Sequence, residues 1–314
     1  MIIFGPIPSR RLGKSLGINN VPMPKTCTYA CIYCQVGPTR NHTIERAAFY
    51  TPPFIFDEVK KHLDKIRRED FPDYLTFVPN GEPTLDMHLG ESIRRLKSLG
   101  IPVAIITNAS LLSDKKVIDE LCEADWVSLK NDSADETIWR SINQPHKHLQ
   151  WEPLQKGLDD FAKVYQGTLV TETMLVEGIN DAPEVLRHTA ARIASLNPYK
   201  AYLTIPIRPP ASSKVHPPTE QVITEAYQIY DEQGLKTELL LGFEGTDTGF
   251  TGNAEEDILN ISAVHPIRED TMAELLRKNK ANPELVDRLV EEKKIKVVSF
   301  NGKNFFLRNI HSKA

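Results

Sequence analysis

Apolar residues along the middle of this chain follow two alternating patterns. Short apolar runs, such as residues 74–78 and 103–106, predict buried strands. The longer segments between them carry an apolar residue every three or four positions, which predicts helices with one buried face. These patterns place strands at 74–78, 103–106, 126–129, 169–176, 201–205 and 237–241, and helices at 54–69, 89–99, 113–124, 135–142, 153–165, 183–196 and 220–233.

Short strands separated by helices of this length indicate parallel β–α units. With a first strand near residues 17–21, about six to seven such units predict an α/β fold whose sheet forms a partial or open (β/α) barrel. Active sites of such barrels lie at the carboxyl ends of the strands. We therefore expect the functional residues among the polar positions that follow each strand.

A different pattern begins after residue 242. Residues 243–254 are rich in Gly, Thr, Asp and Asn, which predicts a linker between a barrel domain at 1–242 and a module at 255–314. In the module we expect three short helices and then a hairpin around the turn dipeptide Asn301-Gly302. The helices are expected at 256–263, 268–278 and 283–292, and the hairpin strands at 295–300 and 303–308.

Three helices and a hairpin resemble a winged helix-turn-helix, for which the functional interpretation is nucleic-acid binding. The third helix, however, carries Glu284, Asp287, Glu291 and Glu292, which make an unsuitable surface for a phosphate backbone. We therefore expect this winged-helix-like module to dock a protein or peptide, or to form a lid on the barrel.

The composition narrows the class of protein. The 314 residues are 40% hydrophobic and 25% charged, which suits a globular chain with one large and one small domain. A formal net charge of −4 gives no overall attraction to nucleic acid or to an anionic membrane. No segment approaches a membrane span, and the N-terminus lacks the layout of a secretion signal. We expect a cytoplasmic protein with no membrane partner.

Three of the four cysteines lie close together, at Cys27, Cys31 and Cys34. Thiolate sulfur suits iron–sulfur clusters, which normally take four cysteine ligands. Three ligands with no fourth nearby leave one iron open, and an open metal position is typical of catalysis. The alternatives are a zinc site with His42 as its fourth ligand, or unrelated buried cysteines. Cys122 falls on the apolar stripe of a predicted helix, where we expect a buried side chain.

Polar motifs follow the second and third predicted strands. Gly81 and Glu82 come after the strand at 74–78. The glycine permits an unusual backbone conformation, and the glutamate brings a carboxylate to the mouth of the barrel, where it suits an ammonium group. Thr107 and Asn108 end the next strand. An ordinary surface turn is the alternative interpretation of Gly81 and Glu82.

The next strand ends in Ser128, Lys130 and Asp132, which alternate onto one face of an extended segment. Such a face suits hydrogen bonds to a ribose or a carboxylate, and a solvated strand end is the alternative. On the following strand Glu172 lies on the face opposite Thr171 and Thr173. Without the register we leave open whether Glu172 points inward or is an exposed charge.

Arginines and one glycine-containing motif complete the candidate residues. Arg208 is a candidate for contact with adenine, a carboxylate or a phosphate, or it is a surface residue before two prolines. Arg10 and Arg11 suit an anionic substrate group, or pairing with acidic neighbours. Residues 12–15 have the ending of a phosphate-binding loop, but Pro8 replaces the required glycine and no helix pattern follows. A nucleotide hydrolase is therefore excluded.

The cysteine spacing, with Tyr33 before the last cysteine, resembles the cluster loop of the radical S-adenosylmethionine (SAM) superfamily. The resemblance implies that Cys27, Cys31 and Cys34 hold a [4Fe-4S] cluster whose open iron is chelated by the amine and carboxylate of SAM. It also implies that Glu82 binds the SAM amine. The further candidates for binding SAM are Gly81, Thr107, Asn108, Ser128, Lys130 and Asp132.

The same resemblance implies an activity. In that superfamily the reduced cluster cleaves SAM to methionine and a 5′-deoxyadenosyl radical, which abstracts hydrogen from a substrate. The electron comes from a donor of the flavodoxin or ferredoxin type. The protein would position the cofactor and exclude water and oxygen.

The segment at 5–17 and the GEPTL sequence at 81–85 resemble a group close to the wyosine-forming tRNA enzymes. Those enzymes carry extra cysteines for a second cluster, and only Cys122 is left here. We therefore do not carry over their two-carbon addition to tRNA. The substrate has two candidate classes, an RNA nucleoside and a protein or peptide docked by the module. A non-catalytic iron–sulfur or zinc regulatory protein is the third alternative.

Overall fold

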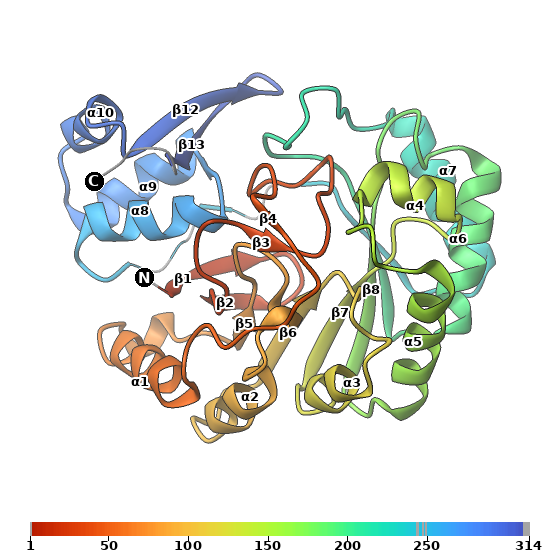
Figure 1. Ribbon diagram of the computed structural model, residues 1–314. Coiled ribbons are helices and arrows are strands. Elements are labelled where there is room, and N and C mark those ends of the chain that lie inside the picture. The colour runs from red at the N-terminus through yellow and green to blue at the C-terminus, as the bar shows by residue number, and fades with distance from the viewer. Residues whose placement is uncertain (1, 243–244, 247, 249, 310–314) are drawn as a thin grey trace.

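The computed structural model describes residues 2–242, 245–246, 248 and 250–309. Its largest element is an eight-stranded sheet in the order β1-β2-β5-β6-β7-β8-β9-β10, which curls into a half-barrel (Figure 1). From β2 onward all neighbours are parallel, and β1 runs antiparallel to β2. The strands are β1 (Ile3–Ser9), β2 (Gly13–Ile18), β5 (Tyr74–Phe77), β6 (Val103–Thr107), β7 (Trp126–Lys130), β8 (Thr168–Met174), β9 (Lys200–Thr204) and β10 (Thr237–Leu240).

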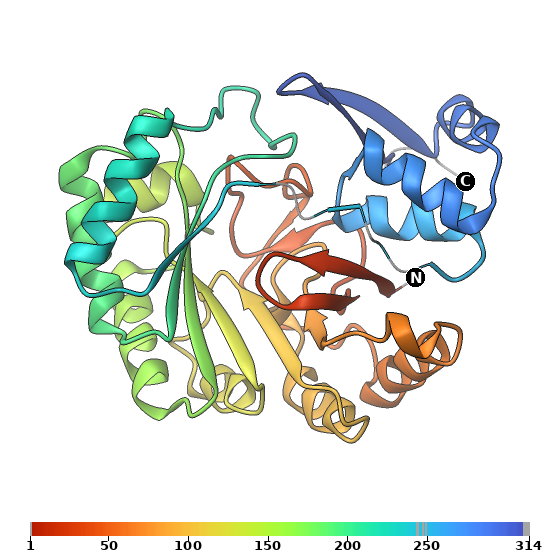
Figure 2. The same ribbon diagram turned by 180° about the vertical axis from the view of Figure 1, so that it is seen from behind.

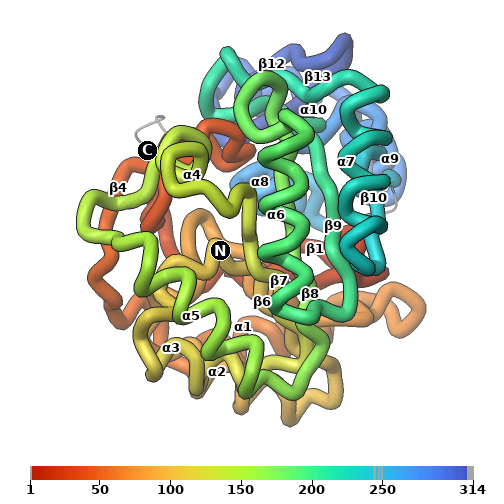
Figure 3. Tube along the Cα trace, turned by 90° about the vertical axis from the view of Figure 1, so that its right-hand side faces the viewer, coloured from red at the N-terminus to blue at the C-terminus, as the bar shows by residue number. Residues whose placement is uncertain are grey.

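Helices connect the parallel strands and cover the outer face of the sheet (Figures 1 and 3). Their apolar faces form the core with the strands, for example where Leu96 and Val127 are fully buried in one cluster. No helix among the described residues is both long enough and apolar enough to cross a membrane. The helices are α1 (Pro52–Leu63), α2 (Leu89–Lys97), α3 (Lys115–Leu121), α4 (Glu136–Asn143), α5 (Trp151–Val164), α6 (Pro183–Ser195) and α7 (Glu220–Glu232).

The α/β half-barrel predicted from the sequence is confirmed, but several ends differ. Helix α1 stops at Leu63 rather than at residue 69, because beyond it only Ile66 is buried and no apolar face continues. Helix α3 is capped by Asp114 rather than Ser113, since the Asp114 carboxylate accepts the N–H of Lys116. These are differences of a few residues at helix ends, where caps decide the boundary.

The N-terminal segment is the main departure from the prediction. The first parallel strand is β2 rather than residues 17–21, and β1 was not predicted at all. The two strands form an antiparallel hairpin in which Gly17 permits close approach, because a Cβ there would lie 2.1 Å from the ring of Phe4. The hairpin tip reaches the half-barrel interior, where Leu12 packs with Trp126 and Tyr202. The hairpin therefore fills part of the barrel lumen.

The C-terminal module packs against this hairpin (Figure 2). Its core cluster contains Ile261 and Leu275 together with Phe4, and Ile7 and Val78 of the barrel pack on the same cluster. The turn predicted between its last two strands is present. Of the predicted linker at 243–254, residues 243, 244, 247 and 249 lie outside the described residues. The module consists of α8 (Ala254–Val264), β11 (Ile267–Arg268), α9 (Glu269–Asn279), α10 (Glu284–Glu291), β12 (Ile295–Phe300) and β13 (Lys303–Arg308).

The shared cluster gives a testable prediction. Phe4 is 4% exposed and joins the barrel hairpin to the module core. Phe4→Ala should lower the free energy of unfolding by about 3–5 kcal/mol, because it leaves a cavity at this junction. Phe71, which is 43% exposed, is the control, and Phe71→Ala should cost within about 0.5 kcal/mol. Urea unfolding measures both. Equal small effects would mean that the module and the barrel do not share a core.

Candidate active site

The cysteine loop connects the short strands β3 (Thr26–Cys27) and β4 (Asn41–His42). Its three cysteines line one cavity of about 300 Å³. This volume lies at the lower end of the roughly 300–1000 Å³ of a typical small-molecule site, so the cavity suits a small-molecule ligand. Five of the predicted SAM-binding residues line the same cavity, namely Gly81, Glu82, Thr107, Asn108 and Lys130.

The end of helix α4 holds the cysteine loop in place. The backbone N–H of Ala30 donates to the carbonyl oxygen of Asn143 at 3.0 Å, and that of Ile32 donates to Ile142 at 3.0 Å. These two N–H groups flank Cys31. Residues 142–146 thus run alongside the loop and satisfy backbone groups that the loop cannot pair within itself.

Gly81 is required for a close approach and not for the unusual backbone conformation predicted from the sequence. The backbone φ angle of Gly81 is not positive. A Cβ at this position would lie 1.7 Å from the carbonyl oxygen of Thr26, and the next residue donates its N–H to that oxygen at 3.2 Å. The glycine therefore lets the end of β5 lie against the start of the cysteine loop.

Glu82 is a buried carboxylate surrounded by neutral donors. It is 1% exposed. Its Oε1 accepts hydrogen bonds from the N–H and hydroxyl of Thr84 at 3.1 and 2.7 Å and from the hydroxyl of Thr107 at 2.6 Å, and its Oε2 accepts from the N–H of Asn108 at 2.8 Å. Burial raises the pKa of Glu82, and these donors offset only part of the shift. Among the described residues no basic side chain pairs with it, so the site favours a cationic ligand.

Lys130 lies inside a buried charge network. Its Nζ is 3.0 Å from Glu172 Oε1 and 3.7 Å from Asp132 Oδ1. Glu172 faces the barrel interior, is 7% exposed, and also pairs with Arg11 from the hairpin tip. Burial alone would raise the pKa of Glu172, but the charges of Arg11 and Lys130 lower it to about 2. Arg11 therefore has an acidic partner, which was one of its two predicted roles.

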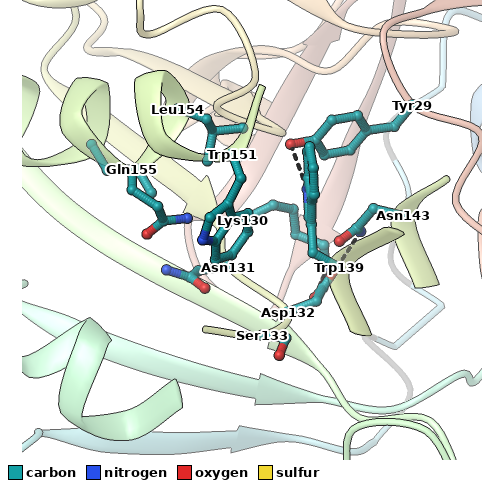
Figure 4. A pocket seen from close by; sticks show the side chains of 11 residues that line it. Tyr29, Lys130, Asn131, Asp132, Ser133, Trp139, Asn143, Trp151, Leu154 and Gln155 are labelled. Atoms are coloured by element: carbon teal, nitrogen blue, oxygen red, sulfur yellow. Dashed lines mark hydrogen bonds and ion pairs between the residues drawn. The ribbon is translucent and has the colours of Figure 1, made fainter. Parts of the chain in front are cut away.

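Ser128 and Asp132 do not line the main cavity. The Ser128 hydroxyl is buried and has no hydrogen-bond partner among the described residues. Asp132 lines a small neighbouring cavity beside Asn143 (Figure 4). It accepts hydrogen bonds from the Tyr33 hydroxyl and, at 2.8 Å, from the N–H of Met174. Only Lys130 of the predicted polar face reaches the main cavity.

The C-terminal module forms part of the cavity wall. Val264 and His265, at the end of α8, line it together with Arg208. Gln35, which follows the last cysteine of the loop, donates to the carbonyl oxygen of Val264 at 3.3 Å and accepts from Arg208 at 2.8 Å. Arg208 Nη2 also lies 3.0 Å from His265 Nε2. The module and the cysteine loop are therefore in direct contact. Arg10, also in the wall, donates to the carbonyl oxygens of Leu240 and Gly242.

Comparisons with known proteins agree with this geometry. A family profile described as "Radical SAM superfamily" matches residues 21–189. The chain belongs to the radical SAM superfamily. The UPF0026 protein MJ1312 of Methanocaldococcus jannaschii is 46% identical over 99% of this chain and 97% of that protein, so the chain is also a member of the UPF0026 family.

Two further matches place this radical SAM enzyme among its relatives. An S-adenosylmethionine-dependent nucleotide dehydratase of Flammeovirga pacifica is 31% identical over 113 residues, which are 34% of this chain and 39% of that protein. The crystal structure of a radical SAM methyltransferase from Sphaerobacter thermophilus is 15% identical with a TM-score of 0.54, covering 72% of this chain and 66% of that chain. The latter likeness shows the fold alone.

Membership of the superfamily implies an iron–sulfur cluster and SAM, and the cysteines suit a cluster better than a single ion. Among the described residues no group of three His, Cys, Asp or Glu side chains converges on one ion. His42, the alternative fourth zinc ligand, is bonded to the carbonyl oxygen of Thr28 at 3.0 Å and does not line the cavity. In a cluster each thiolate binds a different iron, so the sulfurs need not converge.

The charges around the thiols also suit a cluster that carries negative charge when its thiolate ligands are bound. Burial raises the pKa of the Cys27 thiol well above its ordinary value and that of Cys31 to about 11. Lys25 is buried beside them; burial alone would lower its pKa, but Cys34 and Cys27 outweigh this and raise it. Cluster binding must therefore displace thiol protons, and the Lys25 ammonium offsets part of the negative charge that results.

Sequence reasoning missed Lys25, Gln35 and Asn143. The first two lie next to the cysteine motif, and that position was their only signal. Asn143 contacts the loop across more than a hundred residues of chain, which no local pattern reports. The expectation that Cys122 is buried is wrong, because helix α3 ends at the preceding residue and the cysteine caps it as an exposed side chain.

The charge network gives a prediction on stability. Glu172→Gln should lower the free energy of unfolding at pH 7 by about 3–5 kcal/mol, since it leaves Arg11 and Lys130 buried without their shared counter-charge. Glu123 pairs with Arg94 at an exposed site, and Glu123→Gln should cost about 0–1 kcal/mol. Chemical denaturation measures both. A loss below about 1 kcal/mol for the Glu172 variant would contradict the network.

The interactions of Glu172 with Arg11 and Lys130 also predict that stability depends on pH. The pKa of Glu172 is about 2 in the folded chain, against an ordinary value of 4.5. A lowered pKa stabilises the fold above the ordinary value, and this contribution is lost as the pH falls toward 2. The stability difference between wild type and the Glu172 variant should therefore stay constant from pH 7 to pH 5. It should shrink only below about pH 4.5.

Proposed function

We propose that this radical SAM enzyme binds a single [4Fe-4S] cluster through Cys27, Cys31 and Cys34, and that its substrate loses a hydrogen atom at the adjoining cavity. The observation that carries the proposal is the placement of three cysteines and the Glu82 carboxylate in one cavity, where no basic side chain among the described residues pairs with Glu82. When bound, the reduced cluster supplies the electron that splits SAM into methionine and a 5′-deoxyadenosyl radical.

The chain's own residues would hold SAM as follows. Glu82 pairs with the amine, while the Thr107 hydroxyl and the Asn108 N–H orient the Glu82 carboxylate. Lys130 binds the SAM carboxylate or ribose from the barrel side, held in place by Asp132 and Glu172. Gly81 lets the segment that carries Glu82 lie against Thr26 at the start of the cysteine loop. Ser128 does not line the cavity, so in this arrangement it does not contact SAM.

For the substrate we favour a nucleoside of RNA. A relative named as a nucleotide dehydratase shares 31% identity over part of the barrel, which supports a nucleobase-containing substrate. The N-terminal and GEPTL resemblance to tRNA enzymes points the same way. The chain has four cysteines, three of them in the loop, so a second cluster of the wyosine type has no ligand set here. We therefore propose a reaction on a nucleoside that needs only one cluster.

The second candidate substrate is a peptide docked by the C-terminal module. Val264 and His265 bring the module to the cavity wall, so a segment held by it would lie near the cysteines. Three helices and the β11-β13-β12 sheet support a winged-helix-like module at 255–314, following the barrel at 1–242 and the linker at 243–254. We further propose a flavodoxin- or ferredoxin-type electron donor and a cytoplasmic location, where the cysteines stay reduced.

The direct test is cleavage of SAM. Wild-type protein reconstituted with iron and sulfide without oxygen, then given dithionite and SAM, should form 5′-deoxyadenosine and methionine. Cys27→Ala is the control and should form neither. Liquid chromatography with mass detection measures both products. The proposed activity is wrong if wild type forms no more 5′-deoxyadenosine than the control does.

A second prediction concerns metal content. About four irons per chain should be found after reconstitution, the content of one [4Fe-4S] cluster. Cys122→Ser should leave this unchanged, because Cys122 is exposed and distant from the loop in the chain. Iron and sulfide analysis tests both points. Roughly eight irons, or a loss of iron in the Cys122 variant, would reveal a second cluster.

A third prediction concerns Glu82. Glu82→Gln should weaken SAM binding to the reconstituted protein by about 2–5 kcal/mol, which is roughly 30-fold or more in Kd, because the amine loses a buried counter-charge. Binding to wild type should also weaken as the pH falls through the raised pKa of Glu82, since the protonated carboxyl cannot pair. Equilibrium dialysis measures both. Exposed Glu45→Gln is the control, and equal Kd values for the two variants would remove Glu82 from the SAM site.

A further inference from the structure

Two amide side chains, the half-buried Asn108 and the buried Asn143, reach sulfurs of the cysteine loop. Asn108, which follows β6, places its Nδ2 at 3.6 Å from Cys27 Sγ. Asn143, the last residue of α4, places its Nδ2 at 3.5 Å from Cys31 Sγ. Two of the three cysteines of the loop thus each have an amide N–H donor.

The orientation of both amides is fixed by groups other than the sulfurs. Asn143 Nδ2 also lies 2.7 Å from the carboxylate of Asp132, which only accepts hydrogen bonds when ionised (Figure 4). Asn108 Oδ1 lies 3.0 Å from the backbone N–H of Ser110, which can only donate. The NH₂ group of each amide must therefore face the cysteine, and the two N–H···S contacts do not depend on an arbitrary choice between nitrogen and oxygen.

Hydrogen bonds to sulfur are one of the factors that set the reduction potential of an iron–sulfur cluster. An N–H group draws electron density from a thiolate, and the benefit is larger in the reduced cluster because that cluster carries one more negative charge. The burial of Asn143 strengthens its contact with the sulfur, since little water competes with it. Donors at two of the three ligands should therefore shift the cluster toward the reduced state, the state that must form before SAM is cleaved.

The Asn143 contact also connects the cysteine loop to the barrel interior. Asp132, which orients the amide, lies 3.7 Å from the ammonium of Lys130, and Lys130 pairs with Glu172. Arg11 of the hairpin tip completes the series. Asn143 therefore belongs to a series of hydrogen bonds and ion pairs that extends from Cys31 to the hairpin tip.

We propose that Asn108 and Asn143 are positioning residues that raise the reduction potential of the cluster by donating N–H groups to Cys27 and Cys31. The inference rests on the proposed function, because it assumes that these cysteines hold the cluster. It adds to that function an electronic role for two amides, one of which lies outside every sequence motif of the site.

The test is the midpoint potential of the reconstituted cluster, followed by electron paramagnetic resonance during a redox titration of the full chain. Asn108→Ala and Asn143→Ala should each lower it, so that about tenfold less cluster is reduced at a given solution potential, which corresponds to 59 mV for one electron. Asn20→Ala is the matched control. Asn20 is fully buried and its amide donates to Pro83 and Asp86 but to no sulfur, so its variant should keep the wild-type potential.

A measurement on the wild type guards against variants that lose the cluster. Electron–nuclear double resonance of the reduced cluster should detect exchangeable protons that disappear in D₂O. Their number should fall in Asn108→Asp, which keeps the shape and the contact to Ser110 but has no N–H to donate. A wild-type spectrum without exchangeable protons, or wild-type potentials in both amide variants, would overturn the inference while leaving SAM cleavage intact. A wild type that takes up no cluster would overturn the proposed function and this inference with it.

Discussion

The cysteine loop must bring three thiols to one cavity while it has almost no regular structure of its own. Backbone groups that are buried without partners are costly, so the loop depends on neighbouring elements for its hydrogen bonds. The end of α4 supplies carbonyl groups on both sides of Cys31, and Gly81 allows the end of β5 to approach Thr26 within bonding distance. Docking of these two segments on the loop places the thiols beside Glu82, and the rest of the site is arranged around that contact.

Two buried carboxylates of the barrel, Glu172 and Glu82, have different surroundings. Glu172 sits between Arg11 and Lys130 and is fully compensated, so it fixes the hairpin tip and the lysine in place. Among the described residues Glu82 has only neutral donors, and in the proposed function the SAM amine compensates its burial. The first arrangement fixes two basic side chains inside the barrel, and the second leaves a carboxylate with no basic partner in that part of the chain. The module forms one wall of the same cavity, where Val264 accepts a hydrogen bond from Gln35 of the cysteine loop. The barrel, the cysteine loop and the module therefore meet near the cysteines.

The half-barrel and most of the cavity lining could be predicted from the sequence, because both depend on patterns within short segments of the chain. The strand and helix periods gave the half-barrel, and the spacing of Cys27, Cys31 and Cys34 with the polar strand ends gave most of the cavity lining. The hairpin was missed because prolines and glycines at residues 5–17 hide a strand period. Asn143 and the inward direction of Glu172 were not readable, since both depend on contacts between segments far apart in the chain and on register.

In the proposed function the three-cysteine cluster keeps one iron open for SAM next to Glu82. Electron paramagnetic resonance of the reduced wild-type cluster, with SAM labelled at the methionine amine with ¹⁵N, tests this directly. If the iron is open, adding SAM should change the spectrum and produce a hyperfine coupling from the labelled nitrogen. An unchanged spectrum without that coupling would mean that the fourth iron is closed to SAM and that the proposed function is wrong.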